Sequence, residues 1–347
     1  MEDTQLSVAV WRPAESWQAE DQAVELRLKL YRLRVRNAIT GVVVSLVIAA
    51  LALAIQPYFY VVGGLFVLNA VRLVVAGIRH QIRFGRWLPA AASLLNGNPG
   101  HRVAARIVAH KGDRAVLAVG PTHLQVLPVN WGLRQVIART GEITMVGPDS
   151  EGHAVAFVDG VPAPLPAKVV PAPESTTAEP VAPVSLNGAE DPVPNWIATR
   201  VARLQWIPQV AVVVVLAGIV VEAQSSRAVM IYAVTFAVML AIVAILVALM
   251  PSDQMRLPKL LAAGQWQAHP VTVETWKGDG RRPVAELVLL LGVPGGQHRL
   301  VIKYASAELT ANISATGTLW MVGMPKDRRG AAVGVPGYPI VSAARFA

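Results

Sequence analysis

Two polar residues, Asn69 and Arg72, lie within an apolar run of the chain, residues 58–78. An ionisable group inside such a run is a candidate for a function in the membrane. Arg72 is six residues from the end of the run, or ~9 Å along a helix, so its side chain can extend to the interface. Extension to the interface is the first interpretation. A polar contact of Asn69 and Arg72 inside a helix bundle is the functional one, and a transport role is the weakest.

The other residue types that carry chemistry do not form a recognisable site. None of the seven histidines is paired at the spacing of metal ligands, and the absence of cysteine excludes thiolate catalysis and cysteine metal sites. The loop at residues 292–296 (GVPGG) lacks the Lys-Ser/Thr of a phosphate-binding loop. No GxSxG motif marks a nucleophile. The sequence therefore predicts a non-enzymatic protein with no catalytic residue, metal or cofactor.

Four apolar runs dominate the chain, at residues 39–55, 58–78, 207–221 and 228–250. The chain is 54% hydrophobic and only 15% charged, against ~25% charged in soluble domains. A helix needs ~20 apolar residues to cross the hydrocarbon core. We therefore predict two transmembrane hairpins, one at residues 38–78 and one within residues 196–250.

Basic residues cluster where each hairpin begins and where it ends, whereas the short connections between the two helices of each hairpin carry almost none. Lys and Arg mark the cytoplasmic side of a span. Both termini and both long polar segments are therefore expected in the cytoplasm of a four-pass protein of the cell (inner) membrane. The lipid bilayer is the expected partner. The formal net charge of +9 follows from these flanks and does not indicate nucleic acid.

The segments after the two hairpins, residues 79–170 and 251–347, resemble each other. Residues 140–147 (TGEITMVG) match residues 316–323 (TGTLWMVG), and Lys-Gly-Asp occurs at 111–113 and 277–279. Each segment has five or six short strand-like runs separated by turn residues, which is typical of a small barrel or sandwich. The fold class predicted is thus α+β, with two tandem repeats of a helical hairpin and a small all-β domain. SH3-like and OB-like barrels both fit.

Two further segments complete the predicted organisation. Residues 1–37 are expected to be cytoplasmic and to contain a helix from about Ala14, in which acidic residues come first and basic residues last, although alternation over residues 24–30 also fits a strand. Such a helix could continue into the first span. Residues 171–195 are rich in Pro, Ala and Glu and predict a disordered or extended linker.

These features favour a scaffold, adaptor or accessory subunit of a membrane complex. Its two cytoplasmic β-domains would bind a protein partner or self-associate. The alternative is a transporter or channel-like component in which the four helices line a path. The duplication also predicts that the two β-domains pack around a pseudo-twofold axis, as in a covalent dimer.

Overall fold

The computed structural model describes residues 8–13, 22–55, 60–96, 98–176, 179–203, 253–277, 284–293, 296–323 and 330–346. The chain divides into two compact units. The β unit contains residues 1–31, 83–200 and 256–347, and the hairpin unit contains residues 32–82 and 201–255. The predicted spans at 207–221 and 228–250, and the turn at 56–57, lie outside the described residues.

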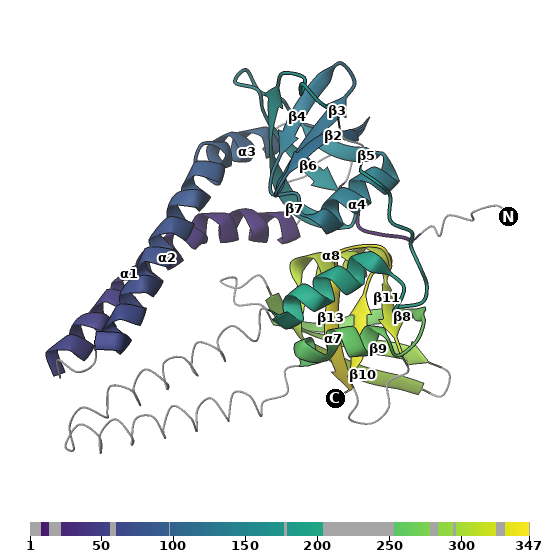
Figure 1. Cartoon of the computed structure of the whole chain (residues 1–347). Helices are drawn as coiled ribbons and strands as arrows, with labels where there is room; N and C mark the ends of the chain where they lie inside the picture. Colours follow the sequence, from purple (N-terminus) through teal and green to yellow (C-terminus); the bar gives the residue numbers. More distant parts are fainter. Residues whose placement is uncertain are drawn as a thin grey trace. The chain divides into compact units, whose positions relative to one another are not determined.

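The described part of the hairpin unit consists mainly of α1 (Gln22–Ile55), which begins in the β unit, and α2 (Tyr60–Phe84), which ends in the β unit (Figure 1). Small residues allow the two helices to approach closely. A Cβ atom built on Gly77 lies 3.5 Å from Cβ of Ala38, and one built on Gly41 lies 2.9 Å from Leu73. Small residues at a helix–helix contact are typical of packing in a membrane.

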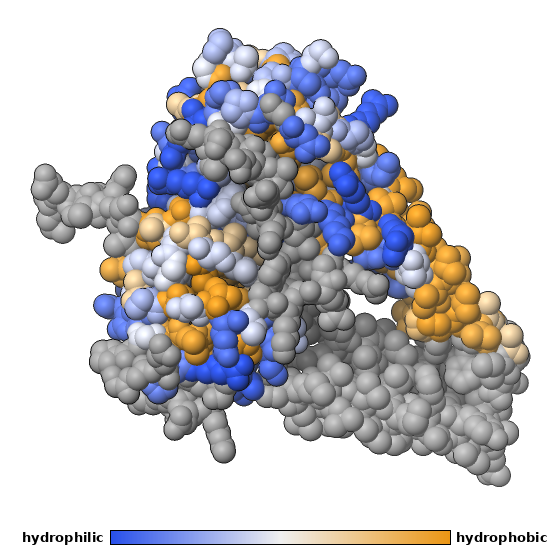
Figure 2. All heavy atoms as spheres, turned by 180° about the vertical axis from the view of Figure 1, so that it is seen from behind, coloured by the Kyte–Doolittle hydropathy of each residue, from blue (hydrophilic) through white to orange (hydrophobic). Residues whose placement is uncertain are grey.

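The large apolar side chains of the hairpin point outward. Ile39 is 61% exposed and Leu68 is 64% exposed, whereas the small residues Ala49 and Ala70 are each 3% exposed. Figure 2 shows this apolar surface along the part of the hairpin that is coloured. By length and composition, α1 and α2 are the two helices among the described residues that could cross a membrane, over Arg27–Leu51 and Gly63–Phe84.

The β unit holds two modules, each with its own sheet. The N-terminal module begins with α3 (Trp87–Leu95) and includes α4 (Trp131–Thr140). Its strands form a seven-stranded sheet in the order β1-β5-β6-β7-β4-β3-β2. They are β1 (His101–Ala104), β2 (Arg106–Lys111), β3 (Arg114–Val119), β4 (Thr122–Val126), β5 (Glu142–Val146), β6 (His153–Val158) and β7 (Val161–Val170).

The C-terminal module begins with α7 (Leu257–Leu261), which directly follows a short 3-10 turn, η2 (Asp253–Arg256), and it includes α8 (Ala307–Thr316). Its strands close into a barrel in the order β10-β13-β12-β11-β8-β9. They are β8 (Trp266–Lys277), β9 (Val284–Val293), β10 (Gly296–Ser306), β11 (Thr318–Val322), β12 (Ala331–Gly334) and β13 (Val341–Phe346).

The strands of the two modules pair in the same succession. In the N-terminal module the edge strands β1 and β2 are separated only by Ala105, with β1 pairing β5 and β2 pairing β3. In the C-terminal module one continuous strand, β8, pairs with β11 through its first half and with β9 through its second half. A register shift occurs in both second halves, between Ile107 and Ala109 and between Val273 and Thr275.

Each sheet is interrupted by a ten-residue helix, which corrects the expectation of all-β domains. Asn130 caps the N-terminus of α4 and Ser306 caps that of α8, and both side chains accept a hydrogen bond from a backbone N–H three residues later. Both helices end at a glycine with positive φ, Gly141 (67°) and Gly317 (61°). The Thr-Gly pair that opens both matching octapeptides is thus the end of a helix.

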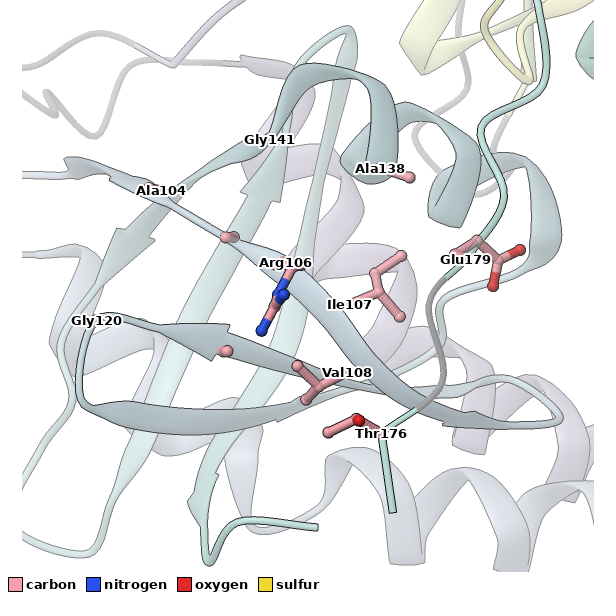
Figure 3. A pocket seen from close by; sticks show the side chains of 11 residues that line it. Ala104, Arg106, Ile107, Val108, Gly120, Ala138, Gly141, Thr176 and Glu179 are labelled. Carbon is pink, nitrogen blue, oxygen red and sulfur yellow. The ribbon is translucent and has the colours of Figure 1, made fainter.

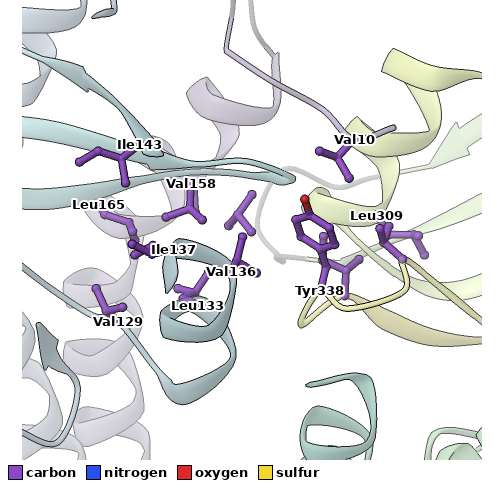
Figure 4. Packing of buried hydrophobic residues seen from close by; sticks show 14 of the residues in the cluster. Val10, Val129, Leu133, Val136, Ile137, Ile143, Val158, Leu165, Leu309 and Tyr338 are labelled. Carbon is purple, nitrogen blue, oxygen red and sulfur yellow. The ribbon is translucent and has the colours of Figure 1, made fainter. Parts of the chain in front are cut away.

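The modules share one hydrophobic core within the β unit (Figure 4). Asn312 on α8 is 3% exposed; its Oδ1 accepts from the Trp11 amide (2.9 Å) and its Nδ2 donates to the Gly160 carbonyl (2.7 Å) in the β6–β7 turn. In the other direction, Nη1 of Arg139 on α4 donates to the Gly337 carbonyl between β12 and β13 (2.9 Å). Each module's helix therefore contacts the loop between the last two strands of the other module.

A second core lies under α3. Trp87, Leu94 and Phe157 are buried there, together with Val24 from the first turns of α1. In the N-terminal segment, residues 8–13 have no regular secondary structure, residues 14–21 lie outside the described part, and from Gln22 the chain is helical without a break to Ile55. Arg27 of this helix forms an ion pair with Glu308 on α8.

Residues 171–176 and 179–191, from the predicted linker, have almost no regular secondary structure but make defined contacts with both modules. Glu179 contacts α4 of the N-terminal module, and the Leu186 carbonyl accepts from the Trp266 amide (2.7 Å) at the start of β8. Residues 192–203 are helical, and Trp196 packs against Trp131 of α4 with ring centroids 5.7 Å apart. The described part of the linker is therefore held in place by hydrogen bonds to both modules.

Candidate functional site

The two residues singled out in the sequence lie in different surroundings on α2. Nδ2 of Asn69 donates a hydrogen bond to Oγ of Ser45 on α1 (3.0 Å), and Ser45 is 4% exposed. The structure therefore gives Asn69 a polar contact between the two helices, at the level of the small-residue packing. Arg72 is exposed on the surface of the hairpin, three residues further along α2. The two side chains are not brought into a common site.

A groove of about 630 Å³ lies in the N-terminal module (Figure 3). Its floor is the bend at Ala105 and the first half of β2, and its walls are the end of α4, the β3–β4 turn and the linker. The lining residues are Ala104, Ala105, Arg106, Ile107, Val108, Ala118, Gly120, Ala138, Gly141, Thr176 and Glu179. The groove arises because β2 is a sheet edge and only its partner β3 pairs with it.

The charged groups at the rim of the groove form a network around Glu179, whose side chain is 5% exposed. Its Oε2 accepts from Nε of Arg134 (3.0 Å) and lies 3.2 Å from Nε2 of His110. Gln135 fixes the same stretch of linker: its Nε2 donates to Oε1 of Glu179 (3.1 Å) and its Oε1 accepts from the Ala182 amide (2.7 Å). The carboxylate of Glu179 is thus already paired with the guanidinium of Arg134 and held in place.

The lining determines what this groove can do. It offers backbone groups, small apolar side chains, the hydroxyl of Thr176 and the cation of Arg106. Such a surface can bind an extended chain or an apolar group by contact, because an edge strand has backbone groups available for pairing. None of its lining residues is a histidine, cysteine or serine, so the groove carries no candidate nucleophile or general base of those types.

Sequence reasoning missed this groove because it missed α4. The signals were present: Asn130 precedes the helix as an N-cap residue, and Gly141 follows it as a terminating glycine. The run between them is short and carries two arginines and a glutamine, so its apolar period is weak. Glu179 could not be found in the same way, because nothing in a Pro- and Ala-rich stretch marks one carboxylate as buried.

A buried carboxylate lies where the linker passes the C-terminal module. Asp191 is 0% exposed, and its Oδ2 accepts from the Gly337 amide (2.7 Å). Burial raises the pKa of Asp191 to about 6, and the hydrogen bond from Gly337 and the charge of Arg139 only partly oppose this rise. The guanidinium of Arg139 also lies over the ring of Tyr338, 4.9 Å from its centroid. These contacts connect the linker, α4 and the β12–β13 loop.

Among the described residues, no group of three His, Cys, Asp or Glu side chains is arranged to hold a metal ion. Comparison of the chain with protein-family models, with curated proteins and with solved structures gives no match.

Proposed function

We propose that this chain is a non-enzymatic, four-pass protein of the cell membrane. In this proposal its two hairpins anchor two cytoplasmic β-modules, which act as a scaffold, adaptor or accessory subunit for a protein partner. The observation that supports the proposal is how apolar and polar side chains are distributed on the described hairpin. Large apolar side chains such as Ile39 and Leu68 point outward, and Asn69 and Ser45 satisfy each other between the helices. Soluble helices have the opposite arrangement.

Duplication of a hairpin-plus-barrel unit is part of the same proposal. The shared succession of strand pairs, the register shift at matching places and the two capped ten-residue helices support it. Unrelated barrels have no reason to agree in all three features. The second hairpin, at residues 207–250, then follows from the sequence as the counterpart of α1 and α2.

The surroundings of the two polar residues of α2, Asn69 and Arg72, favour the scaffold role over a path for solutes. Asn69 is engaged with Ser45, and Arg72 is exposed on the surface of the hairpin. The groove along β2, in contrast, leaves a strand edge open beside α4 and the linker. We place the partner surface there, in a module that faces the cytoplasm.

Single cysteines test the topology, because the native chain has none. Ser314→Cys lies on an exposed position of α8, and Gln56→Cys lies in the predicted outer turn. With a membrane-impermeant maleimide we expect Gln56→Cys to react in intact cells and Ser314→Cys to react only after lysis. Labelling of Ser314→Cys in intact cells contradicts the cytoplasmic placement, and release of the protein by carbonate contradicts membrane insertion.

Crosslinking in the native membrane, followed by gentle solubilisation, tests the scaffold role. We expect a stoichiometric protein partner whose crosslinks map to the groove. Arg106→Glu, which reverses the charge of the groove, should reduce its recovery, and Arg299→Glu on the C-terminal module is the matched control. Repeated recovery of the chain alone, with no self-association, contradicts the proposal.

A further inference from the structure

The described hairpin has a second hollow, distinct from the groove along β2. It is an apolar groove of about 330 Å³ between α1 and α2, next to the end of the hairpin that carries the basic residues. Five residues of α1 (Val35, Ala38, Ile39, Val42 and Val43) and five of α2 (Leu73, Val74, Gly77, Ile78 and Gln81) line it. Below we call it the hairpin groove.

The hairpin groove exists because its floor is made of small residues. Cβ of Ala38 and the Cβ position of Gly77 are only 3.5 Å apart, so the helices touch there without filling the space beside them. The walls are larger side chains that point outward: Ile39 is 61% exposed and Ile78 is 54% exposed. A narrow apolar furrow of this kind, open along its length, suits one hydrocarbon chain.

The end of the hairpin groove is positively charged on one side. Arg32 and Arg36 are exposed. On α1, Arg36 precedes Ile39 by three residues, and Arg32 precedes it by seven. Residues three, four and seven apart share a helix face. The two arginines therefore lie on the groove side of α1, one and two turns before Ile39.

The charge of this surface is not compensated on the hairpin itself. Residues 32–82 contain no aspartate or glutamate, so the arginines have no carboxylate partner within that part of the chain. An arginine pair of this kind suits a phosphate group, which guanidinium binds through two parallel hydrogen bonds. The furrow and the arginines together select a molecule with an anionic head and a long apolar chain.

We propose that the hairpin groove binds an anionic phospholipid, with one acyl chain between α1 and α2 and the phosphate at Arg32 and Arg36. This inference rests on the proposed function, because it requires the hairpin to cross a bilayer. It goes further by naming a retained lipid class and the residues that hold it. Each basic residue near an anionic surface favours binding by roughly fivefold.

The test uses the full chain in nanodiscs of phosphatidylcholine that contain a minority of phosphatidylglycerol with a photoactivatable acyl chain. We expect the lipid that remains on the protein after mild detergent exchange to be enriched in phosphatidylglycerol roughly tenfold or more over the bulk. Photocrosslinks should map to Ile39, Val43 or Val74. Arg32→Gln/Arg36→Gln should return retention to the bulk composition.

The matched control is Arg72→Gln/Arg79→Gln. It removes the same charge from exposed positions of α2 that lie on a different face from Gly77 and the groove walls. We expect it to keep the enrichment, so equal loss in both double variants overturns the site and indicates general attraction to anionic lipid. Val74→Trp fills the furrow and should remove the acyl crosslinks while both arginines remain.

Two other outcomes are distinguishable from these. Crosslinks from Val74→Cys to a cysteine within residues 207–250, with no lipid enrichment, overturn the proposal, because the second apolar pair then occupies the groove. Failure of the chain to enter nanodiscs at all refutes the proposed function itself. Entry into nanodiscs without enrichment refutes only the lipid site.

Discussion

Asn312 offers the sharpest test of how the two modules are joined. Its side chain makes three hydrogen bonds, to the Trp11 amide (2.9 Å), the Gly160 carbonyl (2.7 Å) and the Glu308 carbonyl of its own helix (2.7 Å). The first two partners come from segments 301 and 152 residues away. One amide group thus connects the N-terminal segment, the β6–β7 turn and α8.

The cost of Asn312→Ala follows from the partners that remain. Truncation leaves the Trp11 N–H and the Gly160 C=O buried with one bond fewer, at about 1–3 kcal/mol for each unsatisfied group. A loss of about 2–6 kcal/mol in unfolding free energy is therefore expected. For a unit of this size that corresponds to a fall of roughly 4–20 °C in Tm.

Hydrogen exchange in detergent micelles provides the local measurement. Trp11 donates to Asn312, and Gly160 in turn donates to the Trp11 carbonyl (2.8 Å), so Asn312→Ala should speed exchange in peptides that cover residues 8–13 and 159–161. Ser314→Ala, exposed on the same helix, is the control and should leave both peptides unchanged. If Asn312→Ala matches Ser314→Ala in Tm and in exchange, the modules do not meet through this contact and the reasoning is refuted.

Three other substitutions test the remaining contacts. In the folded state the pKa of Asp191 is about 6, above the ordinary 3.8, so the folded state binds the proton more tightly than the unfolded state. The unfolding free energy should therefore fall by up to ~3 kcal/mol as pH rises from about 4 to above 6. Asp191→Asn should flatten this pH dependence in thermal melts taken across that range. Glu179→Gln leaves the buried guanidinium of Arg134 without its carboxylate and should cost about 3 kcal/mol, with faster proteolysis of the linker, whereas Glu174→Gln, on an exposed linker position, should not. Gly141→Ala places a side chain at φ 67° and should cost about 1–2 kcal/mol by denaturant unfolding; a neutral result would contradict the cap.

The sequence predicted the strands better than the elements between them. The two segments in which strand-like runs were expected, residues 79–170 and 251–347, contain β1–β7 and β8–β13, and Gly112 between β2 and β3 has a positive φ (62°). Alternation and turn residues are local signals, which one chain displays fully. α4 and α8 were missed because ten residues with polar positions such as Arg134 and Gln135 on the packed side do not show an apolar period.

The contacts that join the modules could not be read from the sequence for a different reason. Nothing in the sequence around Asn312 indicates that residue 11 is its partner. The contacts of the linker could not be predicted from the sequence for the same reason. Its composition has too few apolar residues to form a core of its own, but Glu179 and Asp191 are buried against surfaces that other parts of the chain supply.

The interface also bears on the proposed duplication. α4 and α8 have equal length and matching caps, so Asn312, sixth in α8, corresponds to Val136, and Arg139, ninth in α4, corresponds to Ala315. Each helix contacts the loop between the last two strands of the other module, yet each does so with a residue that its counterpart lacks. In a dimer of identical chains every contact is made twice and must be self-complementary. Once two copies are covalently joined that constraint disappears, and each side can specialise. A duplicated chain with an asymmetric interface can therefore present two different module surfaces to a partner, which a homodimer of single units could not do.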